Sequence, residues 1–341
     1  MGLDKRCDCT VTFESALANQ GARLTAAALS LGRRIAFDPV SALARETPMR
    51  LFPPSQLSPN QHCRLMEAAD GWIAVNLARP EDREALPAWI NCDATNAPIE
   101  TLWNVISNAV RASPTATLIA QAVLLGMPVA KVSPPSTLAG QLSPKLWDRP
   151  RAPGANRTAL DLSALWAGPY CGALLAEAGF VVTKIESPVR PDPTANDVRL
   201  NGRKRHHSLD LADPSLTAMI IDTDVLITSA RPHALARLSL TEERLFALNP
   251  SLLWIAITAY GWSGEAALRV GFGDDCAAAA GLLGLNAGKP VFLGDALADP
   301  ITGIVAATET LEAVLNGKAG LVDVALAPTA AAFAQRAGIT G

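Results

Sequence analysis

The stretch "TALDLSALWAGPYCGALLAEAGFVVTKIES" (158–187) decides the fold, because two short apolar runs flank a segment of small residues. Residues 158–163 predict a strand that ends in the turn "ALWAGPYC". The following "GALLAEAG" predicts a helix closed by Gly179, since glycine is common just beyond a helix C-terminus. Residues 180–187 then predict a buried strand. Strand, helix and strand in this order indicate a parallel α/β unit.

The same alternation continues toward the C-terminus. Residues 222–230 and 251–261 predict two further strands. The helix expected between them has Thr241 as a candidate N-cap and Pro250 beyond its end. Strands that alternate with helices predict an α/β fold with a doubly wound, mostly parallel, Rossmann-like sheet over residues 158–341.

The first part of the chain divides into three segments of different texture. Residues 1–61 predict an N-terminal helical and irregular segment. Residues 62–131 predict a smaller α/β region, in which "WIAVNLA" (72–78) alternates like a strand and helical patterns follow. Residues 132–157 are rich in Pro, Gly and Ser and predict a linker.

Composition excludes several classes of protein. The chain has 341 residues, of which 49% are apolar and 18% charged, so a core can form and disorder is disfavoured. The net charge is −3, and no long Lys and Arg run indicates nucleic-acid binding. No apolar run reaches the roughly 18 residues of a membrane span, and the first residues lack the layout of a signal peptide. We therefore expect a soluble, cytoplasmic protein. The six cysteines lack the paired spacing of a zinc site, so no metal is expected.

Ligands of parallel α/β sheets bind beyond the carboxyl ends of the strands. No G-x-G-x-x-G follows the first strand, which disfavours a nicotinamide cofactor. The basic cluster "NGRKRHH" (201–207) has the size of a pocket for a small anion, with a solvated turn as the alternative. The predicted strand ends are 164–168, 186–188, 229–232 and 259–264.

Five stretches in order resemble the motifs of CoA-transferase family III, the CaiB/BaiF group. The last contains D-P-I-T-G, similar to the family's D-x-x-[TA]-G, and the resemblance extends from residue 158 to about residue 334. The five are "LDLSALWAGPYCGALLAEAGFVVTKIESP" (160–188), "NGRKRHHSLDL" (201–211), "DVLITSARPHALARLSL" (224–240), "NPSLLWIAITAYGWSG" (249–264) and "ADPITGIVAATETLEAVLNGKAGLVDVAL" (298–326).

This resemblance implies an acyl-CoA:carboxylate CoA-transferase that uses Asp299 as its nucleophile. In that chemistry the carboxylate attacks a thioester to give a mixed anhydride, and the returning CoA thiolate gives an aspartyl-CoA thioester. The substrates implied are acyl-CoA and a carboxylate acceptor, with coenzyme A as the carried group and no metal. The family also implies a homodimer.

The resemblance implies roles for further residues. Backbone N–H groups near Gly261 are candidates for stabilising an oxyanion. Asp274 is a candidate for orienting the site, with helix capping as the alternative. The candidate CoA-binding residues are Trp166, Ala167, Glu186, Lys204, Arg205, Ser229, Arg231 and Arg237, of which the basic ones match cations in the motifs.

The aspartates of "LGDALADPITG" (293–303) also allow a purely structural interpretation. Asp299 followed by Pro300 is typical of a helix N-cap and first turn, and such capping is compatible with a nucleophile. Asp295 is interpreted as a loop residue.

The order of the motifs is unusual for the family. Residues 62–131 resemble the family's later region, yet they precede the motifs that normally come first, so the chain resembles a permuted or truncated member. A non-catalytic CoA-binding or scaffolding protein is therefore the alternative function. An α-methylacyl-CoA racemase is disfavoured, because its catalytic histidine would fall near "GFGDD" (271–275). His206, His207 and His233 are expected at the surface.

Overall fold

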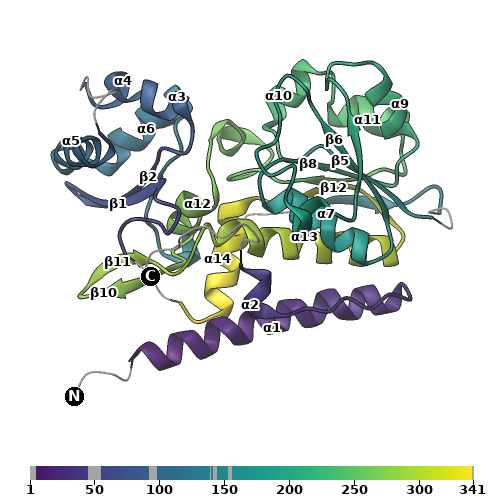
Figure 1. Cartoon of the computed structure of the whole chain (residues 1–341), viewed down its shortest axis with the longest axis horizontal. Coiled ribbons are helices and arrows are strands. Elements are labelled where there is room, and N and C mark those ends of the chain that lie inside the picture. The colour runs from purple at the N-terminus through teal and green to yellow at the C-terminus, as the bar shows by residue number, and fades with distance from the viewer. Residues whose placement is uncertain are drawn as a thin grey trace.

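The computed structural model describes residues 5–44, 55–91, 98–138, 140, 144–152 and 156–339 (Figure 1). Its largest element is a seven-stranded sheet of order β4-β12-β9-β8-β5-β6-β7. Every neighbouring pair is parallel except β4 with β12. The strands are β4 (Lys145–Asp148), β5 (Thr158–Asp161), β6 (Val181–Glu186), β7 (Arg205–Ser208), β8 (Val225–Thr228), β9 (Leu253–Ala256) and β12 (Lys318–Asp323). The predicted mostly parallel α/β sheet is confirmed.

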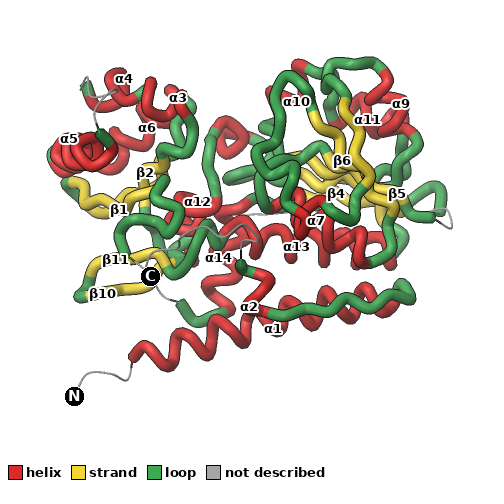
Figure 2. The backbone as a smooth tube through the Cα atoms, in the orientation of Figure 1, coloured by secondary structure: helices red, strands yellow, loops and turns green. Residues whose placement is uncertain are grey.

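Helices cover both faces of this sheet, which makes it doubly wound (Figure 2). Successive side chains of a strand point to opposite faces. Thus Ile255 packs in the core with α7, α13 and α14, whereas Trp254 packs in the core under α9, α10 and α11. The helices of this unit are α7 (Ala167–Glu177), α8 (Val198–Asn201), α9 (Ser215–Ile221), α10 (Pro232–Arg237), α11 (Glu242–Leu248), α12 (Gly273–Ala279), α13 (Ala298–Leu315) and α14 (Leu326–Arg336), with the 3-10 turn η2 (Gly264–Leu268).

The first β-α-β unit follows the sequence pattern, with one difference. Gly179 has φ +91° directly after the α7 C-cap, as predicted for a residue that closes a helix. The helix begins at Ala167 rather than at Gly172, so the second half of the predicted turn is helical. The chain reverses within a shorter turn, in which Leu165 has φ +69°. Thr241 is the N-cap of α11, and its Oγ1 accepts a hydrogen bond from Arg244 N (3.3 Å).

The two edge strands of the large sheet are largely exposed to solvent. β7 lies in the basic cluster, and all four of its residues are exposed. β4 lies within the predicted linker, residues 132–157, and pairs with β12. This segment therefore contributes a strand to the large sheet. The same segment also holds the 3-10 turn η1 (Pro135–Thr137).

The smaller α/β unit is a separate three-stranded antiparallel sheet beside the large one (Figure 1). Its core contains Trp89, Trp103 and Ile106, which pack helices against one face of the sheet. Its elements are β1 (Cys63–Ala68), β2 (Gly71–Asn76), α3 (Pro80–Glu84), α4 (Leu86–Ile90), α5 (Ile99–Arg111), α6 (Thr115–Leu125) and β3 (Val129–Lys131). A hairpin of β10 (Leu283–Asn286) and β11 (Lys289–Phe292), in which Asn286 pairs with Lys289, lies below this sheet in Figure 1.

The N-terminal segment forms α1 (Lys5–Ser30) and α2 (Pro39–Ala42). Helix α1 runs along α13 (Figure 1). Gln20 Nε2 donates to Thr308 Oγ1 (3.1 Å), and the Arg23 guanidinium bonds Glu309 and Glu312. The segment therefore packs on the large unit. Among the described residues, no helix is both long and apolar enough to cross a membrane.

A buried ion pair joins Asp161, the last residue of β5, to Lys204, the residue before β7. Lys204 Nζ lies 2.7 Å from Asp161 Oδ2, and neither side chain is exposed to solvent. The same ammonium donates to Pro169 O (2.8 Å) and to Asn201 Oδ1 (2.9 Å). Burial alone would raise the pKa of Asp161, but the Lys204 and Lys184 charges and the Ser163 hydroxyl outweigh it and lower that pKa to about 2.

We predict that Asp161→Asn lowers the free energy of unfolding by about 3–5 kcal/mol at pH 7, because it leaves the buried Lys204 ammonium without its counter-charge. Urea denaturation measures this change. The pKa of Asp161 is lower in the folded than in the unfolded state. The wild type therefore loses the stability that comes from this pKa difference as the pH falls from about 4 through about 2.

The matched control is Asp148→Asn, because Lys318 Nζ also lies 2.7 Å from Asp148 Oδ1, but at the surface. Solvent screens such a pair, so its loss should leave the urea midpoint unchanged. Equal effects of the two substitutions would show that burial does not make the Asp161 pair important.

Candidate functional site

Asp299 lies in the first turn of α13. The N-cap position is Leu297, two residues earlier, so Asp299 is not the N-cap and that interpretation is wrong. Its N–H donates to Ala296 O (2.8 Å), and Pro300 occupies the first turn as predicted. The Asp299 side chain is half-buried rather than enclosed. A carboxylate at this position is favoured in its charged form by the partial positive charge of the helix start.

The start of α12 lies directly against the Asp299 carboxylate. A Cβ added to Gly273 would lie 2.5 Å from Asp299 Oδ2 and 2.5 Å from Ala296 O. No side chain fits there without moving one of these atoms. Only glycine allows α12 and α13 to begin this close to each other, and the contact limits where the Asp299 carboxylate can lie.

Asp274 and Asp295 are buried next to Asp299 and do not face solvent. The amide of Asn60 bridges them, because Nδ2 donates to Asp274 Oδ2 (2.6 Å) and to Asp295 Oδ1 (2.7 Å). Asp274 Oδ1 also accepts a bond from Ala296 N (2.8 Å). Both carboxyl groups are buried. Asp295 is thus a buried structural residue within its turn, and Asp274 fixes the loop that leads into Asp299. Asn60 has no motif around it that would have identified this role from sequence.

The turn that contains Gly261 contacts α12. Gly261 has φ +151°, a conformation that favours glycine, and Cys276 Sγ lies 3.7 Å from Ala259 O as a weak donor. Trp262 N donates to Asp323 Oδ2 (2.8 Å), so this N–H is already used within the protein. The turn is therefore close to the candidate site, but the Trp262 N–H is not free to bind an oxyanion.

An arginine cluster lies at the carboxyl edge of the large sheet. Arg231 follows β8 and is half-buried, and burial together with the charges of Arg79, Arg190 and Arg237 lowers its pKa. The same surroundings lower the pKa of His233, through burial first and then through Arg231 and Arg237. Guanidinium groups whose charges act on one another in this way are a candidate site for a multiply charged anion.

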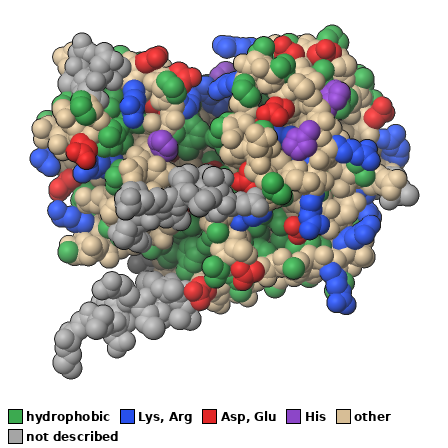
Figure 3. All heavy atoms as spheres, in the orientation of Figure 1, with side chains coloured by type: hydrophobic (Ala, Val, Ile, Leu, Met, Phe, Trp, Pro, Cys, Tyr) green, Lys and Arg blue, Asp and Glu red, His purple; other side chains and the backbone are tan. Residues whose placement is uncertain are grey.

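Arg79 brings the smaller unit into this cluster. It follows β2, and its guanidinium lies 5.5 Å from the ring centre of Phe272, the residue before α12. Figure 3 shows Lys and Arg side chains along the hollow between the two units. Sequence reasoning found Arg231 and Arg237 but missed Arg79 and Arg190. The local sequence around these two has no pattern that indicates where the fold places them.

The two basic residues predicted from "NGRKRHH" (201–207) lie elsewhere. The prediction that Lys204 binds CoA is wrong. All three of its N–H donors are used by interior acceptors, and none remains for a phosphate. Arg205 lies on the exposed edge strand β7, next to His206 and His207, which are exposed as expected. The structure does not bring this pair together with the arginine cluster.

The remaining candidates shape the first strand-to-helix turn. Ser229 Oγ accepts a bond from Ala164 N (2.9 Å), which ties the ends of β5 and β8 together. Trp166 and Ala167 are buried at the start of α7, with the Arg199 guanidinium 6.0 Å from the Trp166 ring. Glu186 ends β6 and is half-buried. Their placement at the strand ends agrees with the predicted ligand edge.

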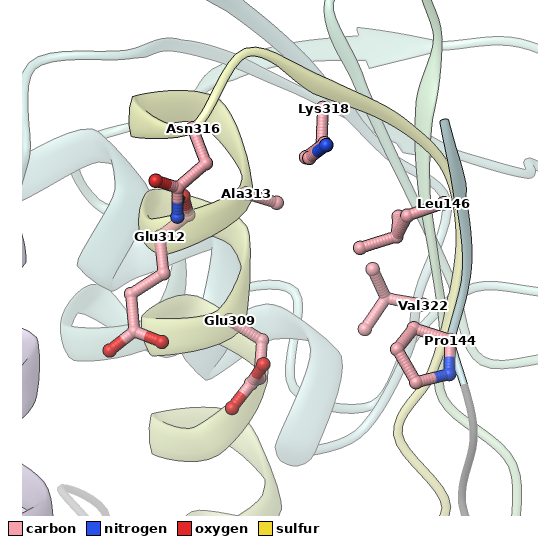
Figure 4. Close-up of a pocket in the computed structure, with 8 residues that line it drawn as sticks. All are labelled: Pro144, Leu146, Glu309, Glu312, Ala313, Asn316, Lys318 and Val322. Atoms are coloured by element: carbon pink, nitrogen blue, oxygen red, sulfur yellow. Dashed lines mark hydrogen bonds between the residues drawn. The ribbon is translucent and has the colours of Figure 1, made fainter. Parts of the chain in front are cut away.

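A cavity of ≈ 460 Å³ lies away from this site, between α13 and the β4–β12 edge (Figure 4). Glu309, one of its lining residues, is ten positions after Asp299, which corresponds to about 15 Å along a helix. The cavity therefore does not form part of the Asp299 site. Its lining residues are Pro144, Leu146, Glu309, Glu312, Ala313, Asn316, Lys318 and Val322.

The fold and site define a mostly parallel α/β protein that presents a carboxylate near a sheet edge with several arginines. Residues 155–340 match the sequence model of CoA-transferase family III, and the chain belongs to this family.

The chain is 30% identical over 201 residues to the succinyl-CoA–D-citramalate CoA-transferase of Chloroflexus aurantiacus, a match covering 52% of this chain and 50% of that protein. It is 31% identical over 198 residues to the succinyl-CoA–L-malate CoA-transferase beta subunit of the same organism, covering 51% and 49%. The crystal structure of Rv3272 from Mycobacterium tuberculosis matches with a TM-score of 0.48 and 28% identity, covering 57% of each chain. The chain spans about half the length of the curated relatives it matches.

We predict that Asn60→Ala lowers the free energy of unfolding by about 1–3 kcal/mol, because two buried carboxyl groups lose a shared donor. Urea denaturation at pH 7 measures the loss. Asn108→Ala, on the exposed face of α5, serves as the control. It removes no buried hydrogen bond, and because alanine favours a helix more than asparagine it should not lower the urea midpoint. An unchanged midpoint for Asn60→Ala would contradict the bridging role of Asn60.

Proposed function

We propose that the chain is an acyl-CoA:carboxylate CoA-transferase in which Asp299 is the nucleophile. The observation that carries this proposal is the half-buried Asp299 carboxylate at the start of α13, within the family-matched region and against Gly273. The membership of the family and the names of the relatives support CoA transfer as the reaction class.

The proposed reaction is a series of acyl transfers that need no added cofactor. Asp299 attacks the thioester carbonyl carbon, the C–S bond breaks, and CoA leaves as a thiolate. The thiolate then attacks the aspartyl carbonyl of the mixed anhydride, which releases the first carboxylate and leaves an aspartyl-CoA thioester. The acceptor carboxylate attacks this thioester, and the released thiolate takes the new acyl group and restores Asp299.

The surrounding residues suit these steps. The backbone of Gly273 lies directly against the Asp299 carboxylate. It therefore blocks one side of this carboxylate and restricts the directions from which a thioester can reach it. Arg231, supported by the charges of Arg190 and Arg237, would hold the phosphates of CoA at the sheet edge, with the thioester arm directed toward α12. Arg79 would contribute its positive charge nearby, since its guanidinium already bonds Asp82. The homodimer and the cytoplasmic location remain predictions, which light scattering and cell fractionation would test.

A second candidate function is a CoA-binding protein without turnover. It is favoured by the Trp262 N–H, which is engaged by Asp323 at the turn where an oxyanion donor was expected. Calorimetry with CoA, together with a screen of acyl-CoA donors and carboxylate acceptors, separates the two functions. Binding without transfer over a broad panel would support the second.

We predict that Asp299→Asn reduces CoA transfer at least about a thousandfold while CoA binding is retained, because an amide cannot form the anhydride. A coupled assay of acyl-CoA formation measures the rate. Glu309→Gln is the control on the same helix, since Glu309 bonds Arg23 on the outer face and should leave the rate unchanged. Full activity of Asp299→Asn would exclude Asp299 as the nucleophile.

We predict that Arg231→Met weakens CoA binding about tenfold or more, because one charged hydrogen-bond donor to phosphate is lost. Titration calorimetry with CoA gives the change, and pantetheine, which lacks the nucleotide phosphates, should be unaffected. Arg336→Met provides the control, because Arg336 also donates to a backbone carbonyl but lies on α14 at the surface. Equal losses for CoA and pantetheine would contradict phosphate binding by Arg231.

A further inference from the structure

A hydrogen bond between two buried polar side chains connects the smaller unit to α12. Asn76, the last residue of β2, donates from Nδ2 to Asp275 Oδ1 (2.9 Å) in the first turn of α12. Asp275 Oδ1 also accepts a bond from Phe272 N (2.9 Å). Asn76 is 2% exposed and Asp275 is 0% exposed, so water does not reach this contact from the surface.

One oxygen of each of these two side chains has no hydrogen-bond partner. Asn76 Oδ1 and Asp275 Oδ2 are both buried and lack any hydrogen bond. The backbone of Gly271 covers Asp275 Oδ2 closely, because a Cβ added there would lie 2.9 Å from this oxygen. An amide oxygen and an ionised carboxylate oxygen are both acceptors, so neither can satisfy the other. One proton on the carboxyl group would convert Oδ2 into a donor.

The electrostatic surroundings favour that proton. Burial raises the pKa of Asp275 well above its ordinary value, and the neighbouring Asp274 raises it further, against the opposing bonds from Phe272 and Asn76. The other titratable groups that face it are acidic, namely Cys63 on β1, Cys276 on α12 and Tyr260 in the Gly261 turn. Arg269, whose charge acts on Tyr260 and Cys276, lies over the Tyr260 ring, 3.4 Å from its centre.

We propose that Asp275 is a neutral carboxylic acid whose Oδ2–H donates to Asn76 Oδ1, closing a cyclic acid–amide pair that fastens β2 to α12. The pair satisfies both unpartnered oxygens with one proton and places no charge in the interior. It makes Asp275 a positioning residue, because α12 begins at Gly273, which lies against Asp299. The inference concerns the joint between the two units and does not depend on the proposed transferase activity.

The acid–amide pair predicts different stabilities for two substitutions, Asp275→Asn and Asn76→Ala. In Asp275→Asn, an amide N–H replaces the acid O–H, so two amides can form the same cyclic pair without a titratable group. In Asn76→Ala, the acid loses its partner and its hydroxyl is left unbonded in the interior. Asp275→Asn should therefore fold with the stability of the wild type at low pH, whereas Asn76→Ala should be less stable at every pH.

Infrared spectroscopy of the full chain labelled with ¹³C-aspartate tests the protonation state at neutral pH. We expect a carbonyl band of a protonated carboxylic acid that shifts in D₂O, disappears in Asp275→Asn and moves to higher frequency in Asn76→Ala. No protonated aspartate band in the wild type would overturn the proposal. So would a band that is unchanged in Asn76→Ala, which keeps the test decisive even where Asp275→Asn does not fold.

The pH dependence of unfolding gives an independent readout. The folded protein would hold one proton that the unfolded chain releases above the ordinary aspartate pKa of about 3.9. Relative to Asp275→Asn, the unfolding equilibrium constant of the wild type should rise about tenfold per pH unit above this value, until the folded-state pKa is reached. A ratio between the two proteins that is constant from pH 5 to pH 8, taken as roughly the neutral range, would overturn the proposal.

Discussion

The carboxylate of Asp274 connects three segments that are far apart in the chain. It accepts hydrogen bonds from Ala296 N, in the loop before α13, and from Asn60, in the segment before β1. Asp274 itself belongs to the first turn of α12. These bonds are buried, so breaking one leaves an interior carboxyl group without a hydrogen-bond partner. The loss of folding free energy is then larger than for the same bond at the surface, where water replaces the partner. The position of Asp299, three residues after Ala296, depends on this junction.

The candidate ligand edge carries arginines from both units of the molecule. The large sheet supplies the strand ends and Arg231, whereas the smaller unit supplies Arg79 from the residues after β2. The same β2 strand ends at Asn76, which bonds α12. A relative movement of the two units would therefore change the arginine cluster and the support of Asp299 together.

The sequence predicts those parts of the structure that local patterns determine. The β5, α7 and β6 elements follow from apolar runs and Gly179, and Asp299 follows from a motif. The edge strands β4 and β7 have no such pattern. Their residues are largely exposed, so polar and apolar side chains need not alternate along them. The burial of Lys204 could not be foreseen either, since it depends on α7 covering Asp161. Likewise, Asn60 and Arg79 acquire their roles only through tertiary contacts.

In the proposed reaction, one carboxylate, that of Asp299, bonds covalently to the acyl group and then to CoA. Mass spectrometry of the protein after incubation with an acyl-CoA donor and hydroxylamine tests this most directly, because hydroxylamine converts an aspartyl anhydride or thioester into a stable hydroxamate. We expect the modification on the peptide that contains Asp299, dependent on acyl-CoA and absent from Asp299→Asn. A hydroxamate on another residue, with Asp299 unmodified during turnover, would contradict the account.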